Sequence, residues 1–125
     1  NAYLKWRYGA HPYLSYEASQ VSCDGRPLGV VIHRTVGDGV RRIVDVYCGE
    51  GDLATVLAAF CRGTSAARLE GVAAGDGLCA CFAQAGFQVF PHGSRVMGET
   101  KRAELVATLG DGRWGFFAGD SDKDR

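Results

Sequence analysis

The sequence predicts an α+β fold: a mixed, mostly antiparallel sheet with two helices. In the first half of the chain, runs rich in β-branched and aromatic residues alternate with glycine-containing turns, a pattern typical of strands. After residue 51 the apolar residues recur at a spacing of three and four, which is typical of a helix. The predicted order of elements is β-β-β-α-β-α-β-β-β.

Three strands are expected first, at residues 16–23, 28–36 and 42–48. They follow an aromatic-rich segment, residues 1–12, that stops at a proline. Asp24-Gly25, a strong hairpin turn signal, separates the first two strands. Gly37-Asp38-Gly39 separates the second from the third. Tight turns join neighbouring antiparallel strands, so these three form a meander.

Two helices are expected at residues 52–62 and 76–85. The apolar residues of the first fall on one helical face: Leu53, Val56, Leu57 and Phe60. Asp52 is a suitable N-cap, because its carboxylate can accept a backbone N–H of the first turn, and Gly63 is a suitable stop. The second helix has Leu78, Cys81 and Phe82 on one face and ends before Gly86.

The remaining strands are shorter. Residues 67–73 predict a fourth strand between the helices, and residues 87–90 (FQVF) predict a fifth after the second helix. Residues 104–109 and 114–117 predict a closing hairpin across Gly110-Asp111-Gly112.

Length and charge narrow the class of protein. At 125 residues the chain is long enough for one core and too short for two, so we expect a single domain over residues 1–125. Its 14 basic residues equal its 14 acidic ones, which argues against nucleic acid or an anionic membrane as partner. No apolar run approaches the roughly 20 residues of a membrane-spanning helix, and no export signal opens the chain.

The five cysteines predict free thiols rather than a disulfide framework. Their number is odd, and Cys79 and Cys81 form a C-x-C pair without a second cysteine or histidine pair at zinc spacing. The three histidines are scattered singly. We therefore expect small buried thiols in a reduced, cytoplasmic protein, with no metal site.

Three strings of the sequence, in this order, resemble a known superfamily. They are WRYGAHP at residues 6–12, CFAQAGF at residues 81–87 and WGFFAGDSD at residues 114–122. The first and last are similar to segments of a divergent branch of the GNAT acyltransferases, and the second resembles their pattern of an aromatic residue four positions before Gly-Phe. The order of elements resembles the C-terminal two-thirds of the GNAT fold.

The resemblance implies a function and a cofactor. GNAT proteins transfer an acyl group from coenzyme A to an amine, which here implies acetyl-CoA or another acyl-CoA as cofactor. The pantetheine arm would lie along the backbone of Val46, Tyr47 and Cys48, and the pyrophosphate on Gly49 and Gly51 before the helix. Genes of the resembled branch often lie near polysaccharide or cell-envelope functions, so the acceptor would be a small or envelope-related amine.

In the resembled proteins the W-R-Y segment lies mid-chain, after a half that supplies further strands and helices. Here it begins at Trp6. We therefore expect the chain to be the C-terminal portion of a longer protein whose preceding half completes the acceptor side. The sequence leaves a homodimer open.

Three residues depart from the superfamily pattern. Glu50 and Asp52 put two negative charges where a pyrophosphate would sit, which Arg41 or Arg62 would have to neutralise. Phe82 stands where many relatives have a tyrosine that protonates the leaving thiolate, and it has no proton to give. Catalytic residues are therefore unassigned, although Cys79 or Cys81 could donate a proton in principle. The alternative is a degenerate, non-catalytic half that serves as a structural or partner-binding module.

A few other polar and aromatic residues remain open. Trp6 and Trp114 are expected in the core, with a ligand platform as the alternative. Asp120 and Asp122 flank Ser121 and are either solvated or bind an amine or a cation. Asp45, in a strand of otherwise apolar residues, is either a water-exposed residue or a buried acid that needs a partner.

Overall fold

A computed structural model describes residues 2–90 and 116–117 of the chain. Its main feature is a four-stranded sheet in the order β1-β2-β3-β4, made of Glu17–Cys23, Arg26–Gly37, Val40–Cys48 and Arg68–Gly71. The first three strands are antiparallel neighbours and β4 runs parallel to β3. The predicted α+β class with a mixed, mostly antiparallel sheet is confirmed.

Both turns of the meander lie where the sequence predicted them. Cys23 pairs with Arg26, so the β1–β2 loop is the two residues Asp24 and Gly25. Both have positive φ, 50° and 77°, as a tight turn between twisted antiparallel strands requires. The β2–β3 loop is also two residues long, Asp38 and Gly39, but only Gly39 has a positive φ, 71°.

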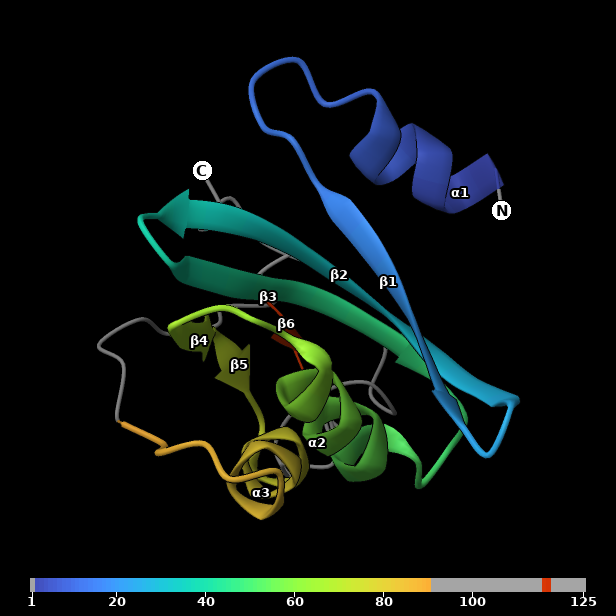
Figure 1. The fold of residues 1–125 in the computed structure, drawn as a ribbon, viewed down its shortest axis with the longest axis vertical. Coiled ribbons are helices and arrows are strands. Elements are labelled where there is room, and N and C mark those ends of the chain that lie inside the picture. Colours follow the sequence, from blue (N-terminus) through green and yellow to red (C-terminus); the bar gives the residue numbers. More distant parts are fainter. Residues whose placement is uncertain (1, 91–115, 118–125) are drawn as a thin grey trace, which may run out of the picture.

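Two helices cover one face of the sheet, α2 (Leu53–Gly63) and α3 (Asp76–Gln84) (Figure 1). Both begin and end within one residue of the predicted bounds. Val31, Ile43 and Val46 of the sheet meet Leu57 and Phe60 of α2 in the main core. The helix comes close to the strands at Gly29, where a Cβ atom would lie 3.2 Å from Cγ2 of Val56.

The opposite face of the sheet is covered only by the N-terminal segment within the described residues (Figure 1). This segment contains a short helix, α1 (Ala2–Leu4), and a π-helical turn, η1 (Lys5–Gly9). The expected number of two helices was therefore wrong, since α1 is a third. No apolar period marks residues 2–9, because aromatic residues occupy both sides; Leu4 and Tyr8 face the sheet, and Trp6 does not.

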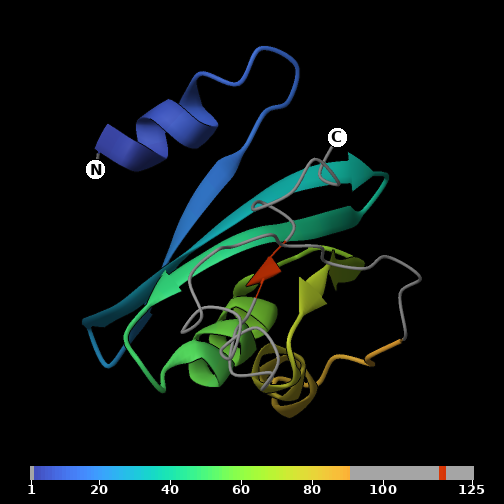
Figure 2. The same ribbon diagram turned by 180° about the vertical axis from the view of Figure 1, so that it is seen from behind.

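The end of the described chain departs most from the prediction. The expected strand at residues 67–73 is divided into β4 and the two-residue β5 (Ala73–Ala74), and β5 pairs with β6 (Phe116–Phe117) (Figure 2). Residues 87–90 form no strand. The Phe87 N–H donates instead to the Phe82 carbonyl oxygen at the end of α3 (3.1 Å). Residues 104–109 and the Gly110-Asp111-Gly112 turn lie outside the described residues.

Candidate functional site

Strand β3 has two halves with different neighbours. The first half, Val40–Ile43, pairs with β4, and the second half has no partner in β4. The change coincides with a bulge, because the register with β2 skips Val44. A bulge bends its strand and increases its twist. β3 and β4 therefore form a fork that opens directly after Ile43.

An aromatic ring from α3 lies where this fork opens. Gly71, the last residue of β4, pairs with Ile43, and a Cβ atom at Gly71 would lie 3.2 Å from the ring of Phe82. Phe82 is buried and meets Phe87 edge-on, with ring centroids 5.0 Å apart. Phe82 is the residue at which the sequence resemblance led us to expect a tyrosine. The fork thus contains an aromatic ring without a hydroxyl.

The loop from β3 to α2 is a tight turn. The Asp52 N–H donates to the Gly49 carbonyl oxygen (3.1 Å), and Gly51 has a φ of 83°. The expected side-chain cap by Asp52 was wrong, because its carboxylate makes no cap hydrogen bond. Asp52 has αR backbone (φ −88°, ψ −9°) instead of the extended backbone usual for an N-cap. Its carboxylate turns back to Gly49, where a Cβ atom would lie 2.8 Å from Oδ2.

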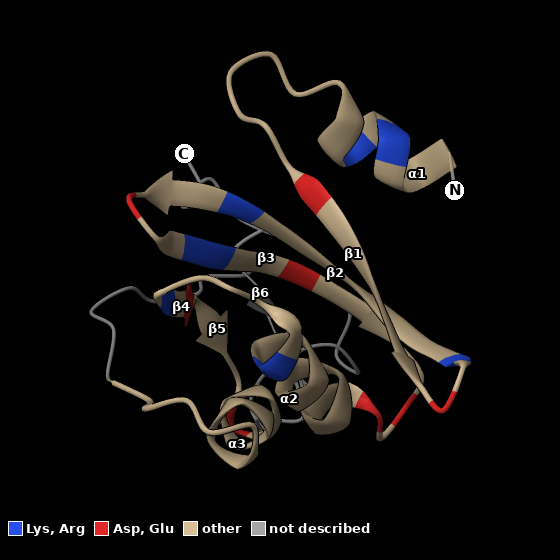
Figure 3. Ribbon diagram, in the orientation of Figure 1, with Lys and Arg blue, Asp and Glu red and all other residues tan. Residues whose placement is uncertain are grey.

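Acidic residues gather at this end of the sheet. Glu50 and Asp52 lie in the loop, and Asp24 lies in the β1–β2 turn at the same end, with Arg26 beside it (Figure 3). Neither Arg41 nor Arg62, which were expected to neutralise these charges, lies near the loop. Arg62 is in the last turn of α2, about 14 Å along the helix from its start.

Arg41 is similarly remote from the loop. It lies in the first half of β3, and its guanidinium donates to Thr64 Oγ1 (3.3 Å). The distance along β3 to Gly49 is about 26 Å at the usual rise per strand residue. The two carboxylates of the loop therefore stand without either expected cation.

The backbone residues expected to hold an acyl-CoA lie in the loop and in the second half of β3, which pairs with β2 but not with β4. Val46 points into the main core, Tyr47 toward the opposite face, and Cys48 is half-buried against the main core. Burial, and then the nearby Asp52 and Cys81, raises the pKa of the Cys48 thiol. That thiol stays protonated at neutral pH, and all five cysteines are free.

Asp45 is a buried acid with three hydrogen-bond donors, which resolves the choice that the sequence left open. Its Oδ2 accepts the hydroxyls of Tyr8 (2.7 Å) and Tyr47 (2.8 Å), and its Oδ1 accepts the Val46 N–H (2.9 Å). Arg7 Nε donates to the Tyr8 hydroxyl (3.2 Å), and its guanidinium carbon lies 5.6 Å from the centre of that ring. The cluster joins the N-terminal segment to the half of β3 that does not pair with β4.

The phenols of this cluster remain protonated at neutral pH. Burial, followed by the hydrogen bond to Asp45, raises the pKa of Tyr8 to about 12. The same two causes raise the pKa of Tyr47. Sequence reasoning named Tyr47 for its backbone and Asp45 as an open case, but it missed Tyr8, which is 37 residues away in the chain. No local pattern links residues that meet only through the fold.

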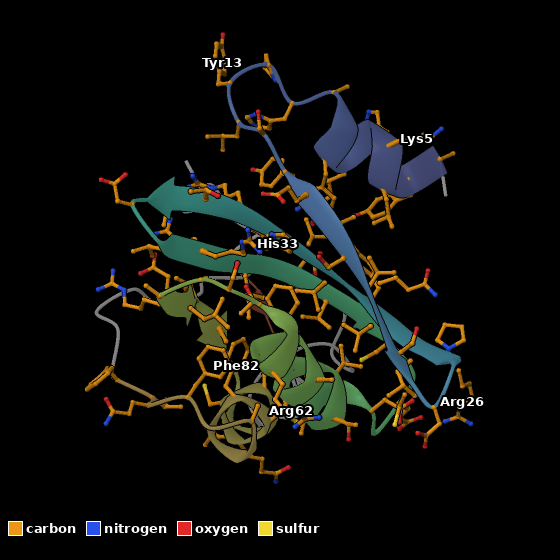
Figure 4. All side chains as sticks on the ribbon, viewed as in Figure 1. Lys5, Tyr13, Arg26, His33, Arg62 and Phe82 are labelled. Carbon is orange, nitrogen blue, oxygen red and sulfur yellow. The ribbon has the colours of Figure 1, made fainter. Side chains whose placement is uncertain are left out.

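His33 is the second buried polar residue of the sheet, 1% exposed on the helix-covered face. Its Nε2 lies 2.8 Å from Ser19 Oγ, and its ring lies against Phe60 with centroids 5.1 Å apart (Figure 4). Its Nδ1 has no hydrogen-bond partner among the described residues. Burial, and then Arg41, lowers the pKa of His33 against the smaller opposing effect of Glu17.

A cavity of about 790 Å³ lies elsewhere, between the end of α2, β4 and the segment from α3 to Phe90. Its polar lining includes Arg68 and Glu70, which pair with each other at 3.1 Å. None of the residues expected to hold an acyl-CoA lines it, although Phe82 does. The cavity therefore borders Gly71 and Phe82, at the opening of the fork, without including the expected cofactor residues.

The last candidates from the sequence are the two tryptophans and residues 120–122. Trp6 is 71% exposed, so the expectation that it lies in the core was wrong. Its neighbours Leu4 and Tyr8 take the buried positions, which turns Trp6 outward. Trp114 and residues 120–122 lie outside the described residues.

Within the described part of the chain, no group of three or more His, Cys, Asp or Glu side chains could hold a metal ion. In the same part, no helix is long and apolar enough to cross a membrane. The chain was compared with family models, curated proteins and solved structures, and none matches it.

Proposed function

We propose that the chain is a GNAT-like acyltransferase domain that binds an acyl-CoA, such as acetyl-CoA, at the fork between β3 and β4. The observation that carries the proposal is the fork itself: two parallel strands that separate at the bulge at Val44, with α2 starting just beyond the end of β3. In this assignment the backbone of Val46, Tyr47 and Cys48 faces the pantetheine arm. Gly49 and Gly51 approach the pyrophosphate.

The reaction we propose is N-acyl transfer to a small or envelope-related amine acceptor. The position of Phe82 supports the resemblance, because its ring lies at the opening of the fork as a tyrosine acid would. Since phenylalanine cannot donate a proton, the leaving thiolate must be protonated by another group or by water. We propose the cytoplasm as the compartment, in keeping with five free cysteines.

Coenzyme A binding tests the proposal. The unmodified chain should bind with a dissociation constant of about 1 mM or weaker, since Glu50 and Asp52 repel the pyrophosphate. The double variant Glu50→Gln/Asp52→Asn should bind roughly tenfold or more tightly in a calorimetric titration. As a matched control, Asp38→Asn/Asp76→Asn removes one charge from the β2–β3 turn and one from the first turn of α3, and should leave the affinity unchanged.

A second function is favoured by a different observation: carboxylates of the chain itself already contact two of the backbone groups that would bind the cofactor. Asp45 holds the Val46 N–H, and Asp52 covers Gly49. A structural or partner-binding module that has lost its cofactor would look like this. Absence of coenzyme A binding in the Glu50→Gln/Asp52→Asn variant would favour the module over the enzyme.

A further inference from the structure

The N-terminal segment is held to the sheet by few side chains. Tyr8 is its only buried residue among those described, and Leu4 is partly buried beside it. Trp6 and Tyr13 are 71% and 89% exposed, and Figure 4 shows Tyr13 at the tip of the segment, pointing away from the sheet. Segments with few buried contacts open at low free-energy cost. Tyr16 packs edge-on to Tyr8, with ring centroids 5.2 Å apart, and Tyr8 is the most deeply buried of the side chains that hold the segment.

Tyr8 also fixes the carboxylate of Asp45. The hydroxyls of Tyr8 and Tyr47 both donate to Oδ2, at 2.7 and 2.8 Å, and so define the plane of the carboxylate. The other oxygen, Oδ1, then lies 2.9 Å from the Val46 nitrogen and accepts its N–H. A backbone donor of β3, in the half that β4 leaves unpaired, is thereby already used.

We propose that the hydrogen bond from Tyr8 to Asp45 is an autoinhibitory contact, by which the N-terminal segment keeps the Val46 N–H unavailable to a ligand of the fork. The inference rests on the proposed function, because it concerns the same β3 backbone. When the segment detaches, Asp45 loses the Tyr8 hydroxyl and keeps only Tyr47 on Oδ2. The carboxylate then turns away, and the Val46 N–H becomes free to donate to an amide carbonyl of the pantetheine arm.

The segment takes positive charge with it when it leaves. Arg7 Nε donates at 3.2 Å to the Tyr8 hydroxyl, which in turn donates to Asp45. Loss of the Tyr8 hydroxyl makes burial of the Asp45 carboxylate less favourable, since a buried carboxylate is stabilised by its hydrogen bonds. A ligand that needs the Val46 N–H binds the detached state and shifts the population toward it.

The experiment compares Tyr8→Phe with Tyr13→Phe, an equally conservative change at an exposed position of the same segment. The full chain is used in the Glu50→Gln/Asp52→Asn background, where coenzyme A binding is expected. Without ligand, Tyr8→Phe should raise the hydrogen exchange rate of the Val46 amide about tenfold relative to the Ile43 amide, and Tyr13→Phe should not. With coenzyme A, Tyr8→Phe should lower the dissociation constant several-fold, up to about tenfold.

The outcomes separate the inference from the function. An unchanged Val46 exchange rate in Tyr8→Phe overturns the contact as a control element. Equal coenzyme A affinity in both variants overturns autoinhibition and leaves the acyl-CoA site standing. No coenzyme A binding in any variant, with Val46 exchange raised by Tyr8→Phe, defeats the proposed function and the inference that depends on it.

Discussion

The two faces of the sheet are held by different kinds of interaction. On the helix-covered face, aliphatic and aromatic side chains of five elements (β1, β2, β3, α2 and α3) pack into one core, which includes Ile43 and Leu57 at 0% exposure. On the opposite face, two buried residues of the sheet, Ile32 and Val44, pack against Tyr8 of the short N-terminal segment, and a carboxylate with three donors joins the segment to the sheet. A core tolerates small movements, whereas a buried charge depends on each donor. We therefore expect the stability of the second face to depend on single hydroxyl groups and the stability of the first on side-chain volume.

The largest loss of stability should follow truncation of the main core. Leu57→Ala removes a fully buried side chain of α2 and leaves a cavity against the sheet, at a cost of about 3 kcal/mol in the free energy of unfolding. The exposed α2 residue Thr55 provides a control, since Thr55→Ala should change stability by less than about 0.5 kcal/mol. Urea denaturation measures both. A cost below about 1 kcal/mol for Leu57→Ala would mean that α2 does not hold this face.

A smaller loss should come from added volume on the same face. Gly29→Ala places a Cβ atom 2.7 Å from the Tyr47 carbonyl oxygen and 2.9 Å from Cys48 Cβ, both of which are fixed in β3. The strands must separate, so we expect a cost of about 2 kcal/mol. Gly9→Ala, where a Cβ atom meets nothing within 4 Å, is the matched control. Thermal unfolding of the two variants shows whether the stability of this face is sensitive to close strand packing or only to cavity formation.

The same contrast explains which parts of the fold could be predicted. The meander and α2 follow from local patterns: turn residues at Asp24-Gly25 and an apolar period from Leu53 to Phe60. The fork between β3 and β4 could not be predicted, because the bulge at Val44 depends on the register with β2. The Tyr8–Asp45 contact likewise depends on residues far apart in the chain.

The position of Asp52 before α2 was predicted correctly, but the contact of its carboxylate was not. Its position before α2 follows from the helical period, but the carboxylate turns to Gly49 because the backbone of Asp52 is already αR. Capping preferences describe the average helix start and do not anticipate a tight turn immediately before it. The identity of a site residue is thus easier to predict than its hydrogen bonds.

His33 makes the helix-covered face sensitive to acid. Its pKa is lowered in the folded protein by burial, so the unfolded chain binds a proton first as the pH falls. Stability should be constant above about pH 6.5 and fall below it until the pH reaches the lowered pKa, by at most about 1.4 kcal/mol per pH unit. Urea midpoints at several pH values between 7.5 and 5.5 measure this slope. In His33→Gln the slope should largely disappear; a slope that persists belongs to other groups.

The smallest effects should separate the two phenols of the second face. Tyr8→Phe removes a hydroxyl from a buried position where water cannot replace it, so we expect a cost of about 1 kcal/mol. Tyr47 is only half-buried, so water can take over its hydrogen bond to Asp45, and Tyr47→Phe should cost less. The double variant should cost more than the sum, because the Val46 N–H would be the last donor to a buried carboxylate. Tyr13→Phe, at an exposed position, is the control and should leave the stability unchanged. Additive costs in this double-mutant cycle would show that Asp45 does not couple the two phenols, and the contrast between the faces would then rest on the core alone.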